Sequence, residues 1–344
     1  MPHSFQLEIK TFTISEGLRR GTLSAREISQ QIFGINEDKI NNSSFIESFS
    51  HFIQSGFNSN KAEDGFITNE DLTKKYKIVE VKNNLDYSSF FCVYIGGTIG
   101  EKGKFNKKKD GLYTSQIMDI EDFTDIPFLF YIHFPIDSSV GVIMMYKTSA
   151  RSMNREVKSF IKSLFSFKGF TVRYRPFISK NQKKEFESFS TVEKIVISQN
   201  VRGGDMDDPY EFFDTEKKYK VKIEVSEINE PTNKFLKRIK KIISKANKDN
   251  TQELFPEFKD AGIDKANADI KTHIKEKGGS SAKANFEDYD SYLEKLLPKI
   301  TLNEKSTVEY GNSTGVFIYD ELLSELNSIL KDEVIPTLNE TDES

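Results

Sequence analysis

The stretch from Val140 to Phe177 constrains the fold most, because its hydrophobic period changes twice within a short span. Val140 to Tyr146 is a continuous apolar run, Met153 to Phe165 has apolar residues at helical spacing, and Phe170 to Phe177 alternates. These patterns are those of a strand, an amphipathic helix and a second strand. We therefore expect a βαβ unit here, with its helix covering one face of a sheet.

Further strands are predicted along the first two thirds of the chain, where apolar residues alternate with polar ones or form short runs. Short polar segments connect several of them, which favours antiparallel neighbours. The predicted fold class is therefore α+β or mixed α/β, with a largely antiparallel sheet. The expected strands are Phe5–Ile9, Tyr76–Val81, Phe90–Ile95, Phe128–Phe134, Thr191–Gln199 and Tyr219–Ile228.

At 344 residues the chain is longer than a typical single domain. We expect a mixed α/β core domain over residues 1–228 and a helical, charge-polarised region over 229–336. Within that region, residues 249–285 are expected to form a polar linker or lid. Fourteen acidic and four basic residues follow position 285, and residues 337–344 are expected to be an acidic tail.

Composition limits the classes of function. The single cysteine, Cys92, excludes an intramolecular disulfide, and its apolar neighbours predict a small buried side chain. The four histidines are too scattered to predict a zinc site or a Ser-His-Asp triad, and His133 is expected in the core. No signal peptide or membrane-spanning run is recognisable, so a cytoplasmic protein is expected. The Lys, Asn, Ile, Phe and Ser content is typical of AT-rich bacterial genomes, where antiviral defence or stress systems encode many such proteins.

The βαβ segment is also strongly basic, with eleven Lys or Arg residues against two Glu between Val140 and Glu185. Helical spacing places four cations of the predicted helix within roughly 60° of one another. Arg173 and Arg175 share one face of the following strand, but the sequence leaves open whether that face joins the helical row. A second basic helix is expected over Lys234–Lys248.

These cations predict a non-catalytic protein without a cofactor that binds the backbone of DNA or RNA. The acidic C-terminal segment is then an internal competitor or a docking surface. An alternative is a subunit of a protein complex, or a homo-oligomer, whose basic faces dock an acidic partner. The predicted binding residues are Lys147, Arg151, Arg155, Lys158, Lys162, Arg173, Arg175, Lys237, Arg238 and Lys241.

A second alternative is an enzyme. Glu80 and Lys82 are predicted on the same face of a strand, with Asp64 and Asp71 upstream, and this arrangement resembles the Asp…(Asp/Glu)-x-Lys core of the restriction-endonuclease-like nuclease superfamily. The resemblance implies that carboxylates hold Mg²⁺ against the scissile phosphate while the lysine assists the attacking water. It covers fewer than twenty residues. The chain departs from the pattern after Lys82, where a strand is expected in place of a helix.

An acidic turn follows Gly203 and Gly204 and offers oxygen ligands of the kind that divalent cations prefer. Its carboxylates are Asp205, Asp207 and Asp208. Their spacing does not match an EF-hand loop, and a solvated turn is the favoured interpretation. No metal site is therefore predicted here.

Overall fold

The chain is described by a computed structural model. Contacts divide it into two units, one formed by residues 1–177 and 299–336 and the other by residues 178–298 and 337–344. This division differs from the expected boundary after residue 228. The structure describes residues 5–17, 21–99, 103–109, 112–118, 126–148, 152–179, 191–202, 216–235, 237, 269–275, 281–285, 300–310 and 317–341.

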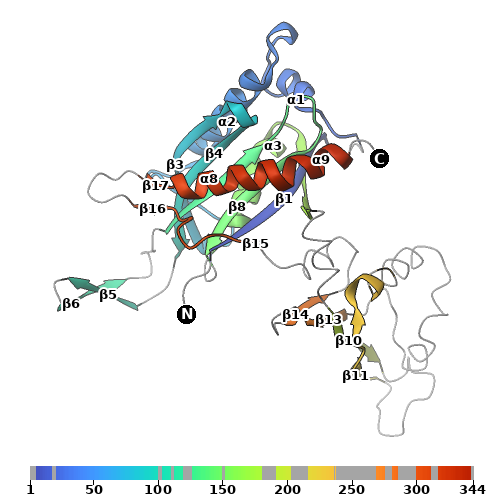
Figure 1. Cartoon of the computed structure of the whole chain (residues 1–344). Helices are drawn as coiled ribbons and strands as arrows, with labels where there is room; N and C mark the ends of the chain where they lie inside the picture. Colours follow the sequence, from blue (N-terminus) through green and yellow to red (C-terminus); the bar gives the residue numbers. More distant parts are fainter. Residues whose placement is uncertain are drawn as a thin grey trace. The chain divides into compact units, whose positions relative to one another are not determined.

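The first unit is built on a large antiparallel sheet (Figure 1), which confirms the predicted fold class. The strand order is β15-β1-β8-β7-β4-β3-β2, and β9 also pairs with β1. The bounds of these strands are β1 (Phe5–Glu16), β2 (Ile67–Thr68), β3 (Lys74–Asn84), β4 (Ser89–Thr98), β7 (Ile126–His133), β8 (Gly141–Thr148), β9 (Phe170–Pro176) and β15 (Ile300–Thr301). Two hairpins stand apart from the sheet, β5 (Gly103–Lys109) with β6 (Leu112–Met118) and β16 (Glu309–Tyr310) with β17 (Phe317–Ile318).

The predicted strand-helix-strand unit is present with another strand between its two strands. Helix α3 (Asn154–Phe167) connects β8 to β9, and both of these strands pair antiparallel with β1. They are therefore parallel to each other, with β1 between them. The sequence pattern identified the three elements correctly but contained no information about the strand inserted from the N-terminus.

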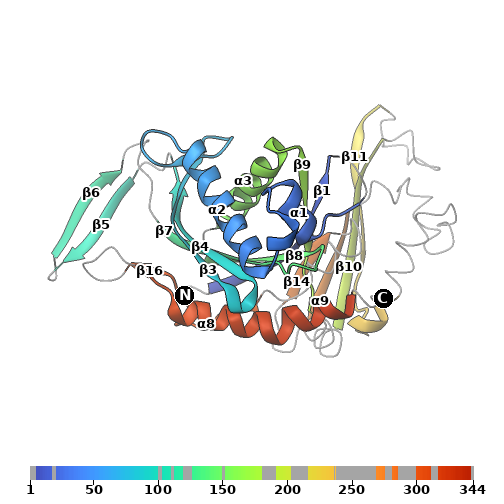
Figure 2. The ribbon, with the colours of Figure 1, turned by 90° about the horizontal axis from the view of Figure 1, so that it is seen from above.

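Helices cover both faces of this sheet (Figure 2). On one face lie α1 (Ala25–Gln31), α2 (Asn42–Asn60) and α3. On the other lies α8 (Asp320–Ile329), which continues through a π-helical turn (Leu330–Val334) into α9 (Ile335–Thr341). Burial of the central strands on both faces explains why β4, β7 and β8 read as nearly continuous apolar runs in the sequence.

Phenylalanine rings fill the space between the sheet and the helices α2 and α3. Phe49 of α2 makes edge-to-face contacts with Phe90 of β4 and Phe165 of α3, at centroid distances of 5.2 and 5.7 Å. Such contacts are favourable beyond the area that the rings bury. The two helices approach closely at Gly56, where an added Cβ would lie 2.5 Å from a methyl carbon of Leu164. Cys92 and His133 are buried in the sheet, as predicted.

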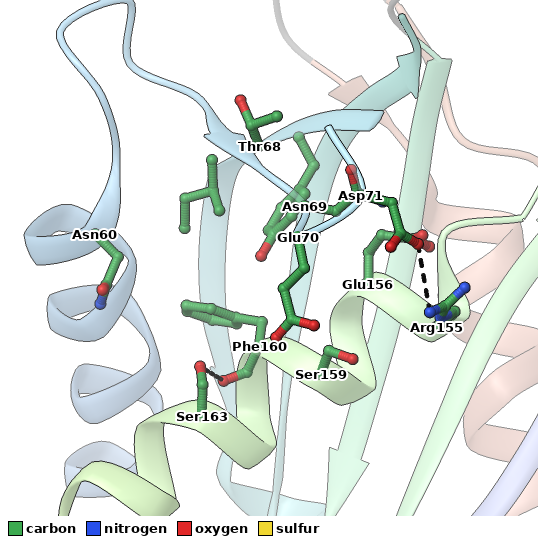
Figure 3. A pocket seen from close by; sticks show the side chains of 12 residues that line it. Asn60, Thr68, Asn69, Glu70, Asp71, Arg155, Glu156, Ser159, Phe160 and Ser163 are labelled. Atoms are coloured by element: carbon green, nitrogen blue, oxygen red, sulfur yellow. Dashed lines mark hydrogen bonds and ion pairs between the residues drawn. The ribbon is translucent and has the colours of Figure 1, made fainter. Parts of the chain in front are cut away.

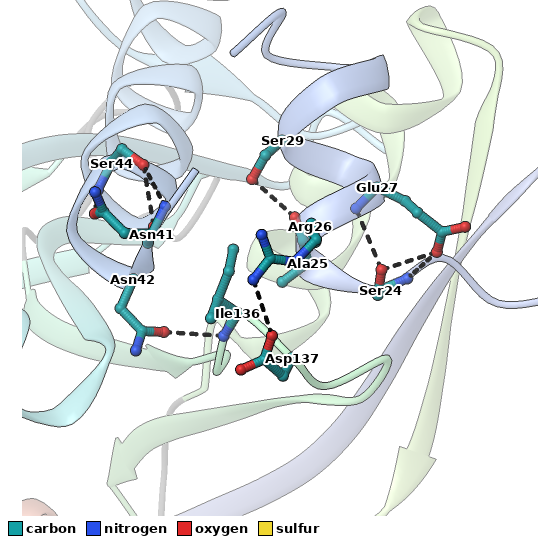
Figure 4. A network of polar contacts seen from close by, with 10 residues as sticks. All are labelled: Ser24, Ala25, Arg26, Glu27, Ser29, Asn41, Asn42, Ser44, Ile136 and Asp137. Carbon is teal, nitrogen blue, oxygen red and sulfur yellow. Dashed lines mark hydrogen bonds and ion pairs between the residues drawn. The ribbon is translucent and has the colours of Figure 1, made fainter. Parts of the chain in front are cut away.

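Side-chain caps fix where α1 and α2 begin (Figure 4). The Ser24 hydroxyl accepts a hydrogen bond from the Glu27 N–H at 3.2 Å, and the Glu27 carboxylate accepts one from the Ser24 N–H at 2.7 Å. This reciprocal arrangement is a capping box. At the start of α2, Asn42 Oδ1 accepts from the Ile136 N–H at 2.9 Å, which ties this helix to the loop between β7 and β8.

The second unit contains a smaller antiparallel sheet in the order β11-β10-β13-β14, with β12 also paired to β10. The strands are β10 (Thr191–Arg202), β11 (Lys218–Val225), β12 (Glu230–Pro231), β13 (Asp269–Lys275) and β14 (Ser281–Asn285). Two of them, β13 and β14, lie within the segment 249–285 that was expected to be a linker or lid. In β13, Ile270, Thr272 and Ile274 alternate with charged or polar residues, whereas the apolar residues of β14 are two alanines.

Candidate functional site

The predicted cationic row of α3 does not form a free surface. Lys158 turns toward the sheet and its ammonium lies 3.0 Å from a carboxylate oxygen of Glu8 on β1. Burial raises the pKa of Glu8, but hydrogen bonds from Asn154 and Lys158 outweigh this effect and the pKa is lowered. Arg155 pairs with Asp71 at 3.4 Å, and both side chains are exposed. The row predicted from helical spacing is thus partly neutralised.

The strand arginines lie on the other face of the sheet from α3. Tyr174 of β9 packs against Phe12 of β1, and Lys162 of α3 lies 5.6 Å from the centre of the Tyr174 ring. Since side chains alternate along a strand, Arg173 and Arg175 point away from that helix. This answers the question that the sequence left open, because the exposed arginine pair is separate from the helical cations.

The remaining predicted cations are dispersed. Lys147 lies in β8 opposite Gln6 of β1 and is half-buried. Lys237 is exposed in a short helical segment of the second unit. Arg151, Arg238 and Lys241 lie outside the described residues, as do Asp205, Asp207 and Asp208 of the acidic turn.

The nuclease-like residues are only partly brought together. Glu80 and Lys82 form an ion pair of 2.6 Å, and Tyr319 beside α8 joins it by donating to Glu80 at 2.8 Å and accepting from Lys82 at 2.7 Å. Hydrogen bonds to Glu80 and Tyr319 raise the pKa of Lys82. Asp64 instead pairs with Lys75 at 2.9 Å and accepts a hydrogen bond from the Phe66 N–H.

A β-bulge explains why Glu80 and Lys82 face α8. The pairing of β3 with β4 shifts between Ile78 and Glu80, so Val79 is an extra residue in the ladder. A bulge reverses the side to which the following side chains point. Ile78 therefore lies opposite Tyr94, whereas Glu80 lies opposite Val93, on the other face. Glu80 and Lys82 consequently contact Tyr319.

The described residues contain no group of three or more His, Cys, Asp or Glu side chains that could hold a metal ion. Asp64, Asp71 and Glu80 of the nuclease alternative are among these described residues and do not form such a group. Glu80 is bound by its neighbours Lys82 and Tyr319, and Asp71 by Arg155. The arrangement favours a structural role for these side chains.

A basic face that sequence reasoning missed lies on the smaller sheet of the second unit. Arg202 of β10 lies directly opposite Lys218 of β11, Asn200 opposite Lys220, and Ser198 opposite Lys222. Side chains alternate between the two faces along each strand, and directly opposed residues lie on the same face. The side chains at these positions therefore share one face of the sheet. The sequence feature that could have predicted this face is the lysine at every second position of β11. The charged residues of this face on β10 and β11 are Lys194, Arg202, Lys218, Lys220, Lys222 and Glu224.

The single carboxylate of this set is shared between two of the cations. Glu224 lies 2.8 Å from Lys194 and 2.9 Å from Lys222. Hydrogen bonds from Lys194 and Lys222 lower the pKa of Glu224 to about 2. Arg202, Lys218 and Lys220 are exposed, and no ion pair is recorded for them within the described part of the chain. The geometry therefore leaves three cations facing solvent.

Comparison with protein-family models finds no match, and comparison with curated proteins also finds none. Of the helices in the described ranges, none has both the length and the apolar character required to cross a bilayer.

Proposed function

We propose that this protein binds a polyanion, DNA or RNA, through the basic face of β10 and β11. The observation that carries the proposal is the direct cross-strand pairing of Arg202 with Lys218. Like charges directly opposite each other destabilise a sheet. The phosphates of a nucleic acid would offset this repulsion. Their neutralisation would also release the counterions condensed on the nucleic acid, which favours binding.

The register also gives the face a regular form. Lys218, Lys220 and Lys222 follow one another at every second residue of β11, so their Cα atoms are about 7 Å apart. Asn200 of β10 lies between Arg202 and Ser198 on the same face and supplies an amide for hydrogen bonding. A row of cations flanked by polar groups binds a phosphate backbone without selecting a base sequence.

Fluorescence anisotropy with duplex DNA, single-stranded DNA and RNA oligonucleotides tests the proposal over a range of salt concentrations. The triple variant Arg202→Gln, Lys218→Gln, Lys220→Gln keeps the ion pairs of Glu224 intact. For duplex DNA it should reduce the slope of log affinity against log salt by about 2 to 3. Glu224→Gln should strengthen binding, because it removes the one negative charge that β10 and β11 place on this face.

The matched control is the double variant Arg173→Gln, Arg175→Gln, which removes two exposed cations from the first unit. It should leave the salt dependence nearly unchanged. Absence of salt-dependent binding, or equal effects of the two sets of substitutions, would overturn the proposal. Loss of oligonucleotide with Mg²⁺ or Mn²⁺ that disappears in Glu80→Ala would instead support the nuclease alternative.

A further inference from the structure

Strand β9 forms an edge of the sheet in the first unit. Among the described residues it pairs with β1 and with no other strand. Two backbone hydrogen bonds fix which of its groups face β1. The Gly17 N–H donates to the Gly169 carbonyl at 3.1 Å, and the Phe177 N–H donates to the Ile9 carbonyl at 3.3 Å. Hydrogen-bonded and non-hydrogen-bonded positions alternate along an antiparallel pair, so the even-numbered residues of β9 direct their backbone groups away from β1.

The backbone groups on this edge suit a further strand. Val172 and Tyr174 each direct an N–H and a C=O outward. Pro176 is also at an outward position, so its missing N–H costs no hydrogen bond to β1. Proline occurs in sheets mainly at such edge positions. An extended segment beside β9 would form backbone hydrogen bonds with the N–H and C=O groups of Val172 and Tyr174.

Cations flank this edge on both faces of the sheet. Arg173 and Arg175 are exposed on the face away from α3, and Lys162 of α3 lies over β9 on the other face. No ion pair is recorded for these three cations within the described ranges. Figure 3 shows a contrasting case, Arg155 beside Asp71, with which it pairs at 3.4 Å. The charges at the edge therefore favour an acidic partner.

We propose that the outer edge of β9 binds an extended acidic segment of a partner protein as an additional antiparallel strand. Directly opposed residues share a face, so acidic side chains at two alternate positions would lie opposite Arg173 and Arg175. The β9 strand of a second copy of this chain fits poorly, because it would bring the same arginines to the edge, where like charges destabilise a sheet. This site is independent of the basic face on β10 and β11, because it uses none of the cations there.

Fluorescence anisotropy with the full-length protein at low salt tests the proposal. The probe is fluorescein-labelled Thr-Glu-Val-Glu-Val-Thr-amide, whose glutamates match the two arginines and whose valines match Val172 and Tyr174. Saturable one-to-one binding is expected. Glutamine in place of both glutamates should weaken binding about fivefold, because two opposite-charge pairs are lost. N-methylation of both valines should abolish binding, because it removes the N–H groups that donate to β9.

The matched control is the peptide with N-methyl groups on both glutamates, whose N–H groups would point away from β9. It should bind nearly as well as the unmodified peptide. In hydrogen exchange, the amides of Val172 and Tyr174 should exchange fast in the unbound protein and slow down when the peptide is added.

Variants of the protein separate strand addition from general attraction. The double variant Arg173→Glu, Arg175→Glu changes two exposed side chains and should reverse the preference, so that Thr-Lys-Val-Lys-Val-Thr-amide binds better than the glutamate peptide. Arg155→Gln removes an exposed cation elsewhere and should leave affinity unchanged. The proposal is overturned if no peptide binds saturably, if N-methylation of the valines and of the glutamates has equal effects, or if the charge-reversed variant still prefers the glutamate peptide. Slow exchange of Val172 and Tyr174 in the unbound protein would overturn it as well.

Discussion

At the scale of single residues, His133 shows how the sheet holds a polar side chain inside the core. The residue is 4% exposed, and its Nδ1 atom lies 2.7 Å from the carbonyl oxygen of Tyr87. Burial lowers the pKa of His133, although contacts with the backbone of Tyr87 and Ser88 oppose that shift. The folded protein therefore keeps this ring neutral at a pH where the unfolded chain takes up a proton.

This difference predicts a loss of stability in mild acid. Below the unfolded pKa of about 6.5, protons bind preferentially to the unfolded chain, so the free energy of unfolding should fall as pH decreases toward the lower folded pKa. One proton accounts for at most about 1.4 kcal/mol per pH unit. Urea unfolding at pH 5, 6 and 7 measures the slope, which His133→Asn should make shallower. A slope in His133→Asn equal to that of the unsubstituted protein would contradict the prediction.

At the scale of elements, sequence periodicity predicts what depends on local pattern. It identified β8, α3 and β9 because their apolar faces follow strand and helix spacing over the whole segment. It also predicted that Glu80 and Lys82 share a face. It did not predict that the bulge at Val79 directs both toward α8, because a bulge depends on the partner strand. For the same reason helical spacing placed Lys158 in a solvent-facing row, while the carboxylate that binds it, Glu8, belongs to a distant strand.

The contact of α8 with the sheet depends on a polar anchor that can be tested. The Tyr319 hydroxyl hydrogen bonds with both Glu80 and Lys82, and its ring packs on Phe91 at 5.2 Å. Tyr319→Phe keeps the ring contact and removes both hydrogen bonds, so it should lower the free energy of unfolding by about 1 kcal/mol. Hydrogen exchange should rise in α8 more than in α2.

Ser324→Ala, at an exposed position of the same helix, is the control for Tyr319→Phe. It should leave exchange in α8 nearly unchanged. Equal stability and equal exchange of Tyr319→Phe and the unsubstituted protein would show that the hydroxyl contributes nothing to the attachment of the helix.

At the scale of the whole molecule, residues 178–298 of the second unit are an insertion between the two segments of the first. The sequence predicted a boundary after residue 228, because the last of the expected strands of the core domain ends there. The division is instead explained by β1, which holds both segments of the first unit together. One edge of β1 pairs with β9, which comes before residue 178, and with β15, which comes after residue 298. Phe177 donates its N–H to the carbonyl of Ile9, and Ile300 lies opposite Leu7. The two ends of the insertion are thus two residues apart along β1, about 7 Å.

This proximity predicts that the insertion can be removed without unfolding the first unit. Joining Phe177 to Lys299 through about four Gly and Ser residues spans up to about 13 Å, more than the gap requires. The shortened chain should unfold cooperatively in urea and lose the proposed polyanion binding. A chain that ends at Phe177 is the matched control. It lacks β15 and α8, so it exposes Leu7, Ile9 and Phe91 and should aggregate. If the joined chain aggregates as well, the first unit needs the insertion in order to fold.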